Sequence, residues 1–293
     1  MAMREDSRAA AAVDATPVSP GREIIYRHSL TVRITHWINV ICFALLLMSG
    51  LAIFNYHPAL YWGNYGYSGV PAFIVIGSTV DLQTRRVVGI TRIGDVSFET
   101  TGVLGVSSDA NGRPTRRAFP SWLTVPSGPG LALARDWHFL MAWLLMFNGL
   151  IYLLFGLFSG HFRHDLAPTA EQMRPRHVLL DIWNHLRLRR PRGDADRHYN
   201  VLQKFAYLAV VLVLLPVMVL SGLTMSPAVT AALPFLFDLF GGRQSARTIH
   251  FLTANLLVLF ALVHVAQVLV AGALNQMRAM ITGRYVVRPE RAS

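Results

Sequence analysis

The sequence predicts an all-α membrane protein built as a bundle of four transmembrane helices. Its 293 residues are 53% hydrophobic and only 15% charged, which is too apolar for an ordinary soluble domain. Four stretches also reach the length of about 20 apolar residues that a helix needs to cross the hydrocarbon core of a bilayer. The expected spans are residues 33–54, 135–158, 201–224 and 247–272.

The distribution of arginine gives the expected orientation. The formal charge is +11, and Lys204 is the only lysine. Arginines gather before the first span, between the second and third, and after the fourth. The positive-inside rule places both termini and segment 159–199 in the cytoplasm, and segments 55–130 and 225–246 outside. Within the inner segment, apolar residues at helical spacing predict an amphipathic helix on the membrane surface over 176–187. We therefore expect a multi-pass protein of the bacterial inner membrane. The arginines flank apolar spans instead of forming one polar face, so no nucleic-acid partner is expected.

Two segments outside the spans carry further expectations. Residues 1–22 have no apolar core, so we expect a disordered cytoplasmic tail before a membrane domain over 23–293. The long segment 55–130 is expected as a periplasmic insert with minor β content, because 73–76 and 87–90 are short β-like runs. A loop of this length is either a docking surface for a soluble partner or a lineage-specific insert.

Four of the eleven histidines fall in or at the ends of the spans. An ionisable side chain within a span is costly and marks a functional site, although any single one can be a neutral ring hydrogen-bonded between helices. Fourteen residues separate His250 from His264, so both leave the same helical face, about 21 Å apart. In the predicted orientation His36 lies at the depth of His264, and His138 at the depth of His250. The rival to His36, His28, lies about two turns earlier and outside the apolar stretch.

Two facing histidine pairs at two depths indicate haem ligation. Cys42 is the only cysteine, which excludes an iron–sulfur cluster and covalently attached haem. Bis-histidine ligation fills both axial positions of a haem iron, and the function that remains is electron transfer. The sequence thus predicts two non-covalent b haems in the bundle core. Their iron ligands are His36 and His264 on the inner side, and His138 and His250 on the outer side.

Residues close to these histidines have two interpretations each. Three arginines precede a histidine by three residues and share its helical face: Arg33, Arg135 and Arg247. They are candidate partners of haem propionates, and arginines that only set the membrane orientation would occupy the same places. Gly50 lies on the face of His36, where the missing side chain favours either a haem macrocycle or close helix packing.

A faint internal repeat links the first span to the third and the second to the fourth. Ser-Gly-Leu occurs at 49–51 and again at 221–223, and Ala-Arg-x-x-His occurs at 134–138 and again at 246–250. These matches suggest an ancient duplication of a helix pair, and matches this short also arise by chance.

These motifs resemble the prokaryotic cytochrome b561 / nickel–hydrogenase cytochrome b family, whose best-understood relative is the formate dehydrogenase gamma subunit. The resemblance rests on Arg-Ile-Thr-His-Trp at 33–37, on 134–138, on Tyr-Asn-Val-Leu-Gln-Lys at 199–204, on His250 and His264, and on Met-Ile-Thr-Gly at 280–283. It covers all four spans and implies a di-haem b subunit that exchanges electrons between quinone and a periplasmic oxidoreductase. It also implies the same histidine pairing, and a quinone site near His264 formed by Asn200, Gln203 and Lys204.

Segment 55–130 departs from the formate dehydrogenase and hydrogenase subunits, which have a short connection there. It resembles thiosulfate-reductase-type cytochrome b subunits, which accompany periplasmic molybdopterin enzymes. The resemblance therefore implies a molybdopterin-type partner that docks on 55–130, with this chain as its quinone-reactive electron-transfer subunit and no catalytic residue of its own. Two other functions stay open. One is a stand-alone quinone-linked superoxide oxidase of the same fold, and the other is a non-redox membrane transporter with buried histidines.

Overall fold

A computed structural model describes residues 23–67, 69–109, 111–187 and 200–287. The tail expected at 1–22 lies outside the described residues. The chain divides into two compact units. The first consists of Met1–Trp37, Ile151–Val210 and Leu259–Ser293, and the second of Ile38–Leu150 and Val211–Val258.

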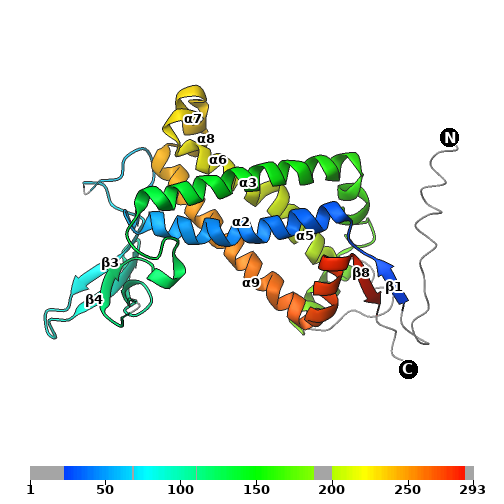
Figure 1. Cartoon of the computed structure of the whole chain (residues 1–293), viewed down its shortest axis with the longest axis horizontal. Helices are drawn as coiled ribbons and strands as arrows, with labels where there is room; N and C mark the ends of the chain where they lie inside the picture. The colour runs from blue at the N-terminus through cyan, green and yellow to red at the C-terminus, as the bar shows by residue number, and fades with distance from the viewer. Residues whose placement is uncertain (1–22, 68, 110, 188–199, 288–293) are drawn as a thin grey trace. The chain divides into compact units, whose positions relative to one another are not determined.

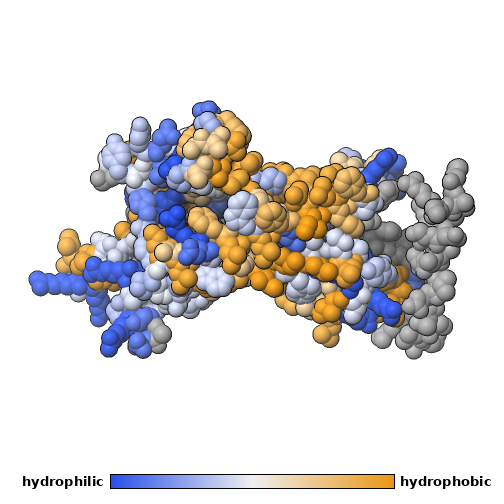
Figure 2. All heavy atoms as spheres, turned by 45° about the horizontal axis from the view of Figure 1, so that its top comes forward, coloured by the Kyte–Doolittle hydropathy of each residue, from blue (hydrophilic) through white to orange (hydrophobic). Residues whose placement is uncertain are grey.

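Four helical stretches are long and apolar enough to cross a membrane. They are α2 (Leu30–Phe54), α3 (Leu131–Phe158), the stretch Val201–Thr224, and α9 (Arg243–Thr282). Hydrophobic side chains gather over these helices (Figure 2). Many large ones are exposed, among them Phe147, Leu259 and Leu262, as expected where a helix faces lipid. The four predicted spans are therefore helical in the structure, as a multi-pass membrane protein requires.

The third span is interrupted in its middle. Helix α5 (Val201–Ala209) passes into the π-helical segment η6 (Val210–Leu214), and α6 (Leu215–Thr224) follows. Pro216 stands in the first turn of α6. A proline has no N–H to donate to the carbonyl four residues earlier, and its ring crowds that carbonyl. The wider π-helical turn lies directly before this proline.

The fourth span contains a break of its own. Helix α9 runs from Arg243 to Thr282, but Gly272 has a backbone φ of 101° and ψ of 86°. Glycine adopts this conformation without the steric cost that a side chain would add. The fourth span was predicted to end at residue 272, where this break lies, and a further helical segment follows it up to Thr282.

The first unit joins the beginning and the end of the membrane domain. Strand β1 (Glu23–Tyr26) pairs antiparallel with β8 (Arg284–Val287), as Figure 1 shows. Tyr285 is fully buried against Ile25, and the guanidinium of Arg27 lies 4.4 Å from the centre of its ring. Strands that pair in this way lie on one side of a membrane, because their hydrogen bonds join them directly.

The first unit also contains the segment between the second and third spans. The π-helical turn η4 (Phe162–Leu166) precedes helix α4 (Pro175–Leu186). Helix α4 matches the amphipathic helix predicted over 176–187 except for Arg187, and its apolar residues Leu179, Leu180 and Trp183 are exposed. An exposed apolar face suits a helix that lies on a lipid surface.

Segment 55–130 belongs to the second unit and folds into short strands. One antiparallel sheet has the order β2 (Ala59–Leu60), β3 (Ile74–Val80), β4 (Val87–Ile93) and β5 (Val96–Glu99). Strands β6 (Gly105–Ser108) and β7 (Pro114–Arg117) form a second antiparallel pair, and the short helix η3 (Ser121–Leu123) follows. Two further short helices, α7 (Pro227–Ala232) and α8 (Phe235–Phe240), precede α9.

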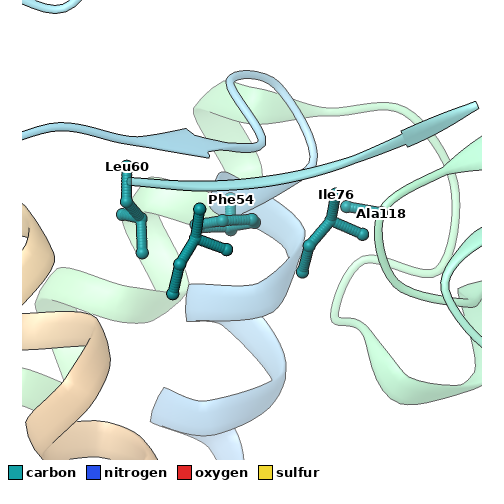
Figure 3. Packing of buried hydrophobic residues seen from close by; sticks show 5 residues of the cluster. Phe54, Leu60, Ile76 and Ala118 are labelled. Atoms are coloured by element: carbon teal, nitrogen blue, oxygen red, sulfur yellow. The ribbon is translucent and has the colours of Figure 1, made fainter. Parts of the chain in front are cut away.

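A small apolar core attaches these strands to the helices of the second unit. Its buried members are Phe54, Leu60, Ile74, Ile76 and Ala118, most of which Figure 3 labels. Phe54 is the last residue of α2, and its ring stacks on Phe251 of α9 with the ring centroids 4.8 Å apart. The strands therefore pack on the ends of two membrane helices and are not a free loop.

Candidate functional site

The four histidines singled out from the sequence form two facing pairs, one in each unit. In the first unit, the ring centroids of His36 on α2 and His264 on α9 are 6.3 Å apart. In the second unit, those of His138 on α3 and His250 on α9 are also 6.3 Å apart. The structure thus brings together the partners that equal depth in the membrane had predicted. His28 is buried in the first unit and is not the ring that faces His264.

The distance within each pair suits an iron held between two imidazoles. Metal–nitrogen bonds to histidine are about 2 Å long. Two such bonds on opposite sides of an iron, plus the distance from each ring centre to its own nitrogen, amount to roughly 6 Å. The ring planes are inclined by 57° in the first pair and 60° in the second. The two donor sets therefore fit the axial ligation of a haem.

The second pair is fixed by hydrogen bonds on the far side of each ring. Nδ1 of His138 lies 3.1 Å from Oγ of Ser49, and Nδ1 of His250 lies 3.1 Å from Oγ of Ser221. The His250 nitrogen is also 3.1 Å from the carbonyl oxygen of Met218, and Leu46 makes the equivalent backbone bond to His138. A carbonyl only accepts, so Nδ1 carries the proton, and Nε2 of each ring is left to bind a metal.

A glycine next to each serine makes room for the ring. A Cβ at Gly50 would lie 3.3 Å from Cε1 of His138, and a Cβ at Gly222 would lie 3.3 Å from Cε1 of His250. Gly50 therefore contacts the outer histidine itself, which supports close packing as its role. Ser49–Gly50 on α2 and Ser221–Gly222 on α6 make matching contacts, so the faint repeat in the sequence corresponds to a repeated structural arrangement.

The first pair has different surroundings. Nδ1 of His36 is buried and has no hydrogen-bond partner among the described residues. The ring of Trp37 lies edge-on to His36, and its Nε1–H donates to the carbonyl of Met280 over 3.1 Å. His264 stacks on Phe260 and contacts the ring of Tyr207. This pair is positioned by aromatic packing more than by hydrogen bonds.

The three arginines expected near haem propionates have different environments. Arg33 donates through Nη1 to the carbonyl of Ile281 over 2.6 Å, and its buried Nε has no partner among the described residues. Arg135 is exposed and lies 5.6 Å from the ring of Phe139. Of the three, Arg33 has a buried donor that an added carboxylate would satisfy.

Arg247 makes its hydrogen bonds to the protein backbone. Its guanidinium donates to the carbonyls of His57 and of Ala59, the latter over 2.9 Å. Burial and the charge of Arg247 lower the pKa of His57. The contacts join the second turn of α9 to the start of segment 55–130, a role that the sequence did not suggest.

The residues expected at a quinone site lie at the start of α5. The side chain of Asn200 accepts a hydrogen bond from the backbone of Gln203, and Gln203 Oε1 accepts one from the backbone of Asn200. This capping box satisfies N–H groups that the first helical turn leaves free. Lys204 is buried, and its Nζ donates to the carbonyl of Ala167 over 3.0 Å. An ammonium group has three donors, so Lys204 can make further hydrogen bonds.

The sequence also contains functional positions whose role we did not predict. Ser49 and Ser221 were noticed only as parts of a repeat. Asn39 on α2 and Asn148 on α3 form a side-chain hydrogen bond of 2.7 Å within the second unit. Two asparagines inside apolar spans are a signal of such a pair, since buried amides in a membrane need partners.

The family model described as prokaryotic cytochrome b561 matches residues 27–283. A protein of Azospira oryzae, provisionally named protein-methionine-sulfoxide reductase subunit YedZ1, is 31% identical over 262 residues, which cover 89% of this chain and 98% of that protein. No solved structure matches the chain. The family match includes all four spans and both histidine pairs, so the chain belongs to the prokaryotic cytochrome b561 family.

Proposed function

We propose that this cytochrome b561-type membrane electron-transfer subunit binds two b haems and passes electrons between membrane quinone and a periplasmic oxidoreductase. The observation that carries the proposal is the presence of two histidine pairs, each with its ring centroids 6.3 Å apart. The family implies haem b as the cofactor. His36 and His264 would hold the inner haem, and His138 and His250 the outer one.

Haem b supplies a one-electron couple when it is bound between two imidazoles. The chain's own contribution would be two imidazoles for each iron, which would keep oxygen and substrates from it. Ser49 and Ser221 orient the ligand rings of the outer pair. The buried, unsatisfied Nε of Arg33 supports a propionate contact at the inner site, because an arginine donor pairs well with a carboxylate. Arg135 and Arg247 remain weaker candidates for this contact.

For the quinone site we favour Lys204 over its neighbours. A quinone carbonyl needs a hydrogen-bond donor, and the buried ammonium of Lys204 has donors beyond the one used on Ala167. Asn200 and Gln203 are bonded to each other, and their amide N–H groups are the donors they have left. Tyr207 and His264 belong to the same unit and contact each other, which supports a site near the inner haem.

The partner is proposed to dock on segment 55–130. This segment has a core of its own and displays large exposed side chains, including Leu82, Val103 and Trp122. The Azospira relative is named as a subunit of a reductase, which supports a partner enzyme for this chain too. We propose a periplasmic enzyme of the molybdopterin type, an inner-membrane location, and both termini in the cytoplasm. The pairing of β1 with β8 supports one side for both ends.

Haem analysis of the purified protein tests the proposal. We expect two b haems per chain, and the loss of one haem in His36→Ala and of the other in His138→Ala. The exposed His177 offers a matched control, since His177→Ala should retain both. A wild-type protein that binds fewer than two haems would contradict the proposal and favour a non-redox function. Two haems without a co-purifying periplasmic enzyme would instead favour a stand-alone quinone-linked oxidase.

A further inference from the structure

The Nδ1 atoms of His138 and His250 have hydrogen-bond partners, and Nδ1 of His36 has none among the described residues. In the second unit, Nδ1 of His138 and Nδ1 of His250 each face a serine hydroxyl at 3.1 Å and a backbone carbonyl. In the first unit, Nδ1 of His36 is buried without a hydrogen-bond partner among the described residues. This difference does not depend on how the two units are arranged, because each pair lies within one unit.

Each serine hydroxyl donates its proton to a backbone carbonyl of its own helix. Ser49 Oγ lies 2.6 Å from the carbonyl oxygen of Leu45, and Ser221 Oγ lies 2.6 Å from that of Val217. A hydroxyl has one proton, and each serine donates it to that carbonyl, so its oxygen is left to accept from the imidazole. Both serines are fully buried, so no water competes for the ring proton.

We infer that Ser49 and Ser221 are positioning residues that make the haem at His138/His250 the one of lower reduction potential. The inference rests on the proposed function, because it requires a haem at each pair. A hydrogen bond accepted from Nδ1–H makes the imidazole a more basic ligand. A more basic ligand stabilises ferric over ferrous iron, which lowers the reduction potential. Nδ1 of His36 makes no such bond to any of the described residues, so the haem at His36/His264 keeps the higher potential.

Redox titration of the full-length protein with serine variants tests this inference. Ser49→Ala and Ser221→Ala each remove one of the two acceptors of a ring proton and leave the carbonyl. We expect each to raise the lower midpoint potential and the double variant to raise it further, with the higher potential unchanged. A tenfold change in the preference for ferric iron corresponds to about 59 mV for a one-electron couple, and we expect a shift of that order for the double variant.

Two control variants separate this tuning from a general loss of packing. Thr224 is also fully buried on α6, but its hydroxyl donates to the carbonyl of Leu220 over 2.8 Å. Thr224→Val should leave both potentials unchanged. Ser49→Thr keeps an acceptor oxygen and should restore the wild-type value. Unchanged potentials in the serine variants, or equal shifts of both haems, would overturn the inference.

A second measurement decides the order of the potentials if the serine variants lose their haem. His264→Ala should keep only the haem at His138/His250, and its potential should match the lower of the two wild-type values. A match to the higher value would overturn the inference while leaving two haems in place. Absence of two haems in the wild-type protein would instead contradict the proposed function, so the two failures are distinguishable.

Discussion

At the scale of single residues, each histidine ring of the His138/His250 pair contacts a serine and the glycine that follows it in the chain. The serine accepts from the ring, and the glycine leaves space for it. A ring held on both sides has little freedom to turn, which preorganises a metal ligand. The same dipeptide occurs in α2 and in α6, so both rings of this pair are held in the same way.

A methyl group at Gly50 should disturb this pair. Its Cβ would lie 3.3 Å from Cε1 of His138, so the ring would have to move by a few tenths of an ångström. We expect Gly50→Ala to lower haem content at this pair and to destabilise the protein by about 1–3 kcal/mol. Haem content per chain and thermal melting in detergent measure both effects. Gly149→Ala on α3 is the control, because a Cβ there meets nothing within 4 Å. Equal behaviour of the two variants would contradict this expectation.

His28 should make stability depend on pH. Burial, followed by the charge of Arg27, lowers its pKa from 6.5 to about 4. The unfolded chain therefore binds a proton at a higher pH than the folded chain, and stability falls as pH drops from 6.5 towards 4. Since one pKa unit corresponds to about 1.4 kcal/mol, the loss is roughly 3 kcal/mol at most.

A neutral replacement of His28 isolates this effect. We expect the melting temperature of His28→Gln to fall less than that of the wild type between pH 6.5 and pH 4, because glutamine does not titrate. His28→Asn, a second replacement that does not titrate, should show the same smaller fall. A wild-type slope in His28→Gln would show that the buried histidine does not carry the pH dependence.

At the scale of elements, the first two turns of α9 hold the start of segment 55–130. Arg247 donates to two carbonyls of this stretch, and Thr248 Oγ1 donates to the carbonyl of Tyr61 over 2.7 Å. Ser245 Oγ accepts from the backbone N–H of Gly63 over 2.7 Å. The helix that carries His250 thus also anchors the segment on which we propose a partner docks. Thr248 and His250 are two residues apart on α9, so the anchor of the segment and the histidine lie within one helical turn.

Removing one of these bonds should loosen the segment. Thr248 is fully buried, so Thr248→Val leaves the carbonyl of Tyr61 buried without its donor. Such a loss costs about 1–3 kcal/mol. We expect lower thermal stability and faster proteolysis within 55–70, with haem content largely retained. Thr79→Val, at an exposed position of β3, should behave like the wild type. Equal proteolysis of both variants would argue against the anchoring role.

The elements also show what the sequence can predict. The four spans were predictable because a bilayer imposes a minimum apolar length, and the pairs of histidines because helical rise converts residue number into depth. The pairing of strands β1 and β8 was not predictable, because each strand has only four residues and its partner lies at the other end of the chain. Asn200 and Gln203 match a capping-box pattern that we had interpreted only as a quinone site. The hydrogen bonds of Ser49 and Ser221 depend on which helix face meets which, and no local pattern records that.

At the scale of the whole molecule, paired terminal strands constrain the membrane topology. Because β1 bonds directly to β8, the chain must cross the membrane an even number of times between them. Four spans satisfy this requirement. The arginine distribution then favours the cytoplasm for both ends.

Reporter fusions at the two ends test this topology. We expect a reporter that is active only in the cytoplasm to be active at either terminus, and the same reporter inserted after residue 112 to be inactive. The chain turns there between β6 and β7 with Gly112 at a φ of 75°, so an insertion is tolerated better than within a strand. Opposite signals from the two termini would contradict the even number of crossings.

The repeated Ser–Gly arrangement bears on symmetry. The offset that carries Ser49 to Ser221 carries His36 to Leu208, and the offset that carries His138 to His250 carries Tyr152 to His264. His138 and His250 are therefore equivalent under the repeat. His36 and His264 are not, because the positions equivalent to them hold Leu208 and Tyr152. A two-helix ancestor could have formed the His138/His250 site by self-association, but the His36/His264 site requires two halves that have already diverged. The His36/His264 pair would then be the later acquisition, and fusing the halves into one chain is what allowed it to become different from the His138/His250 pair.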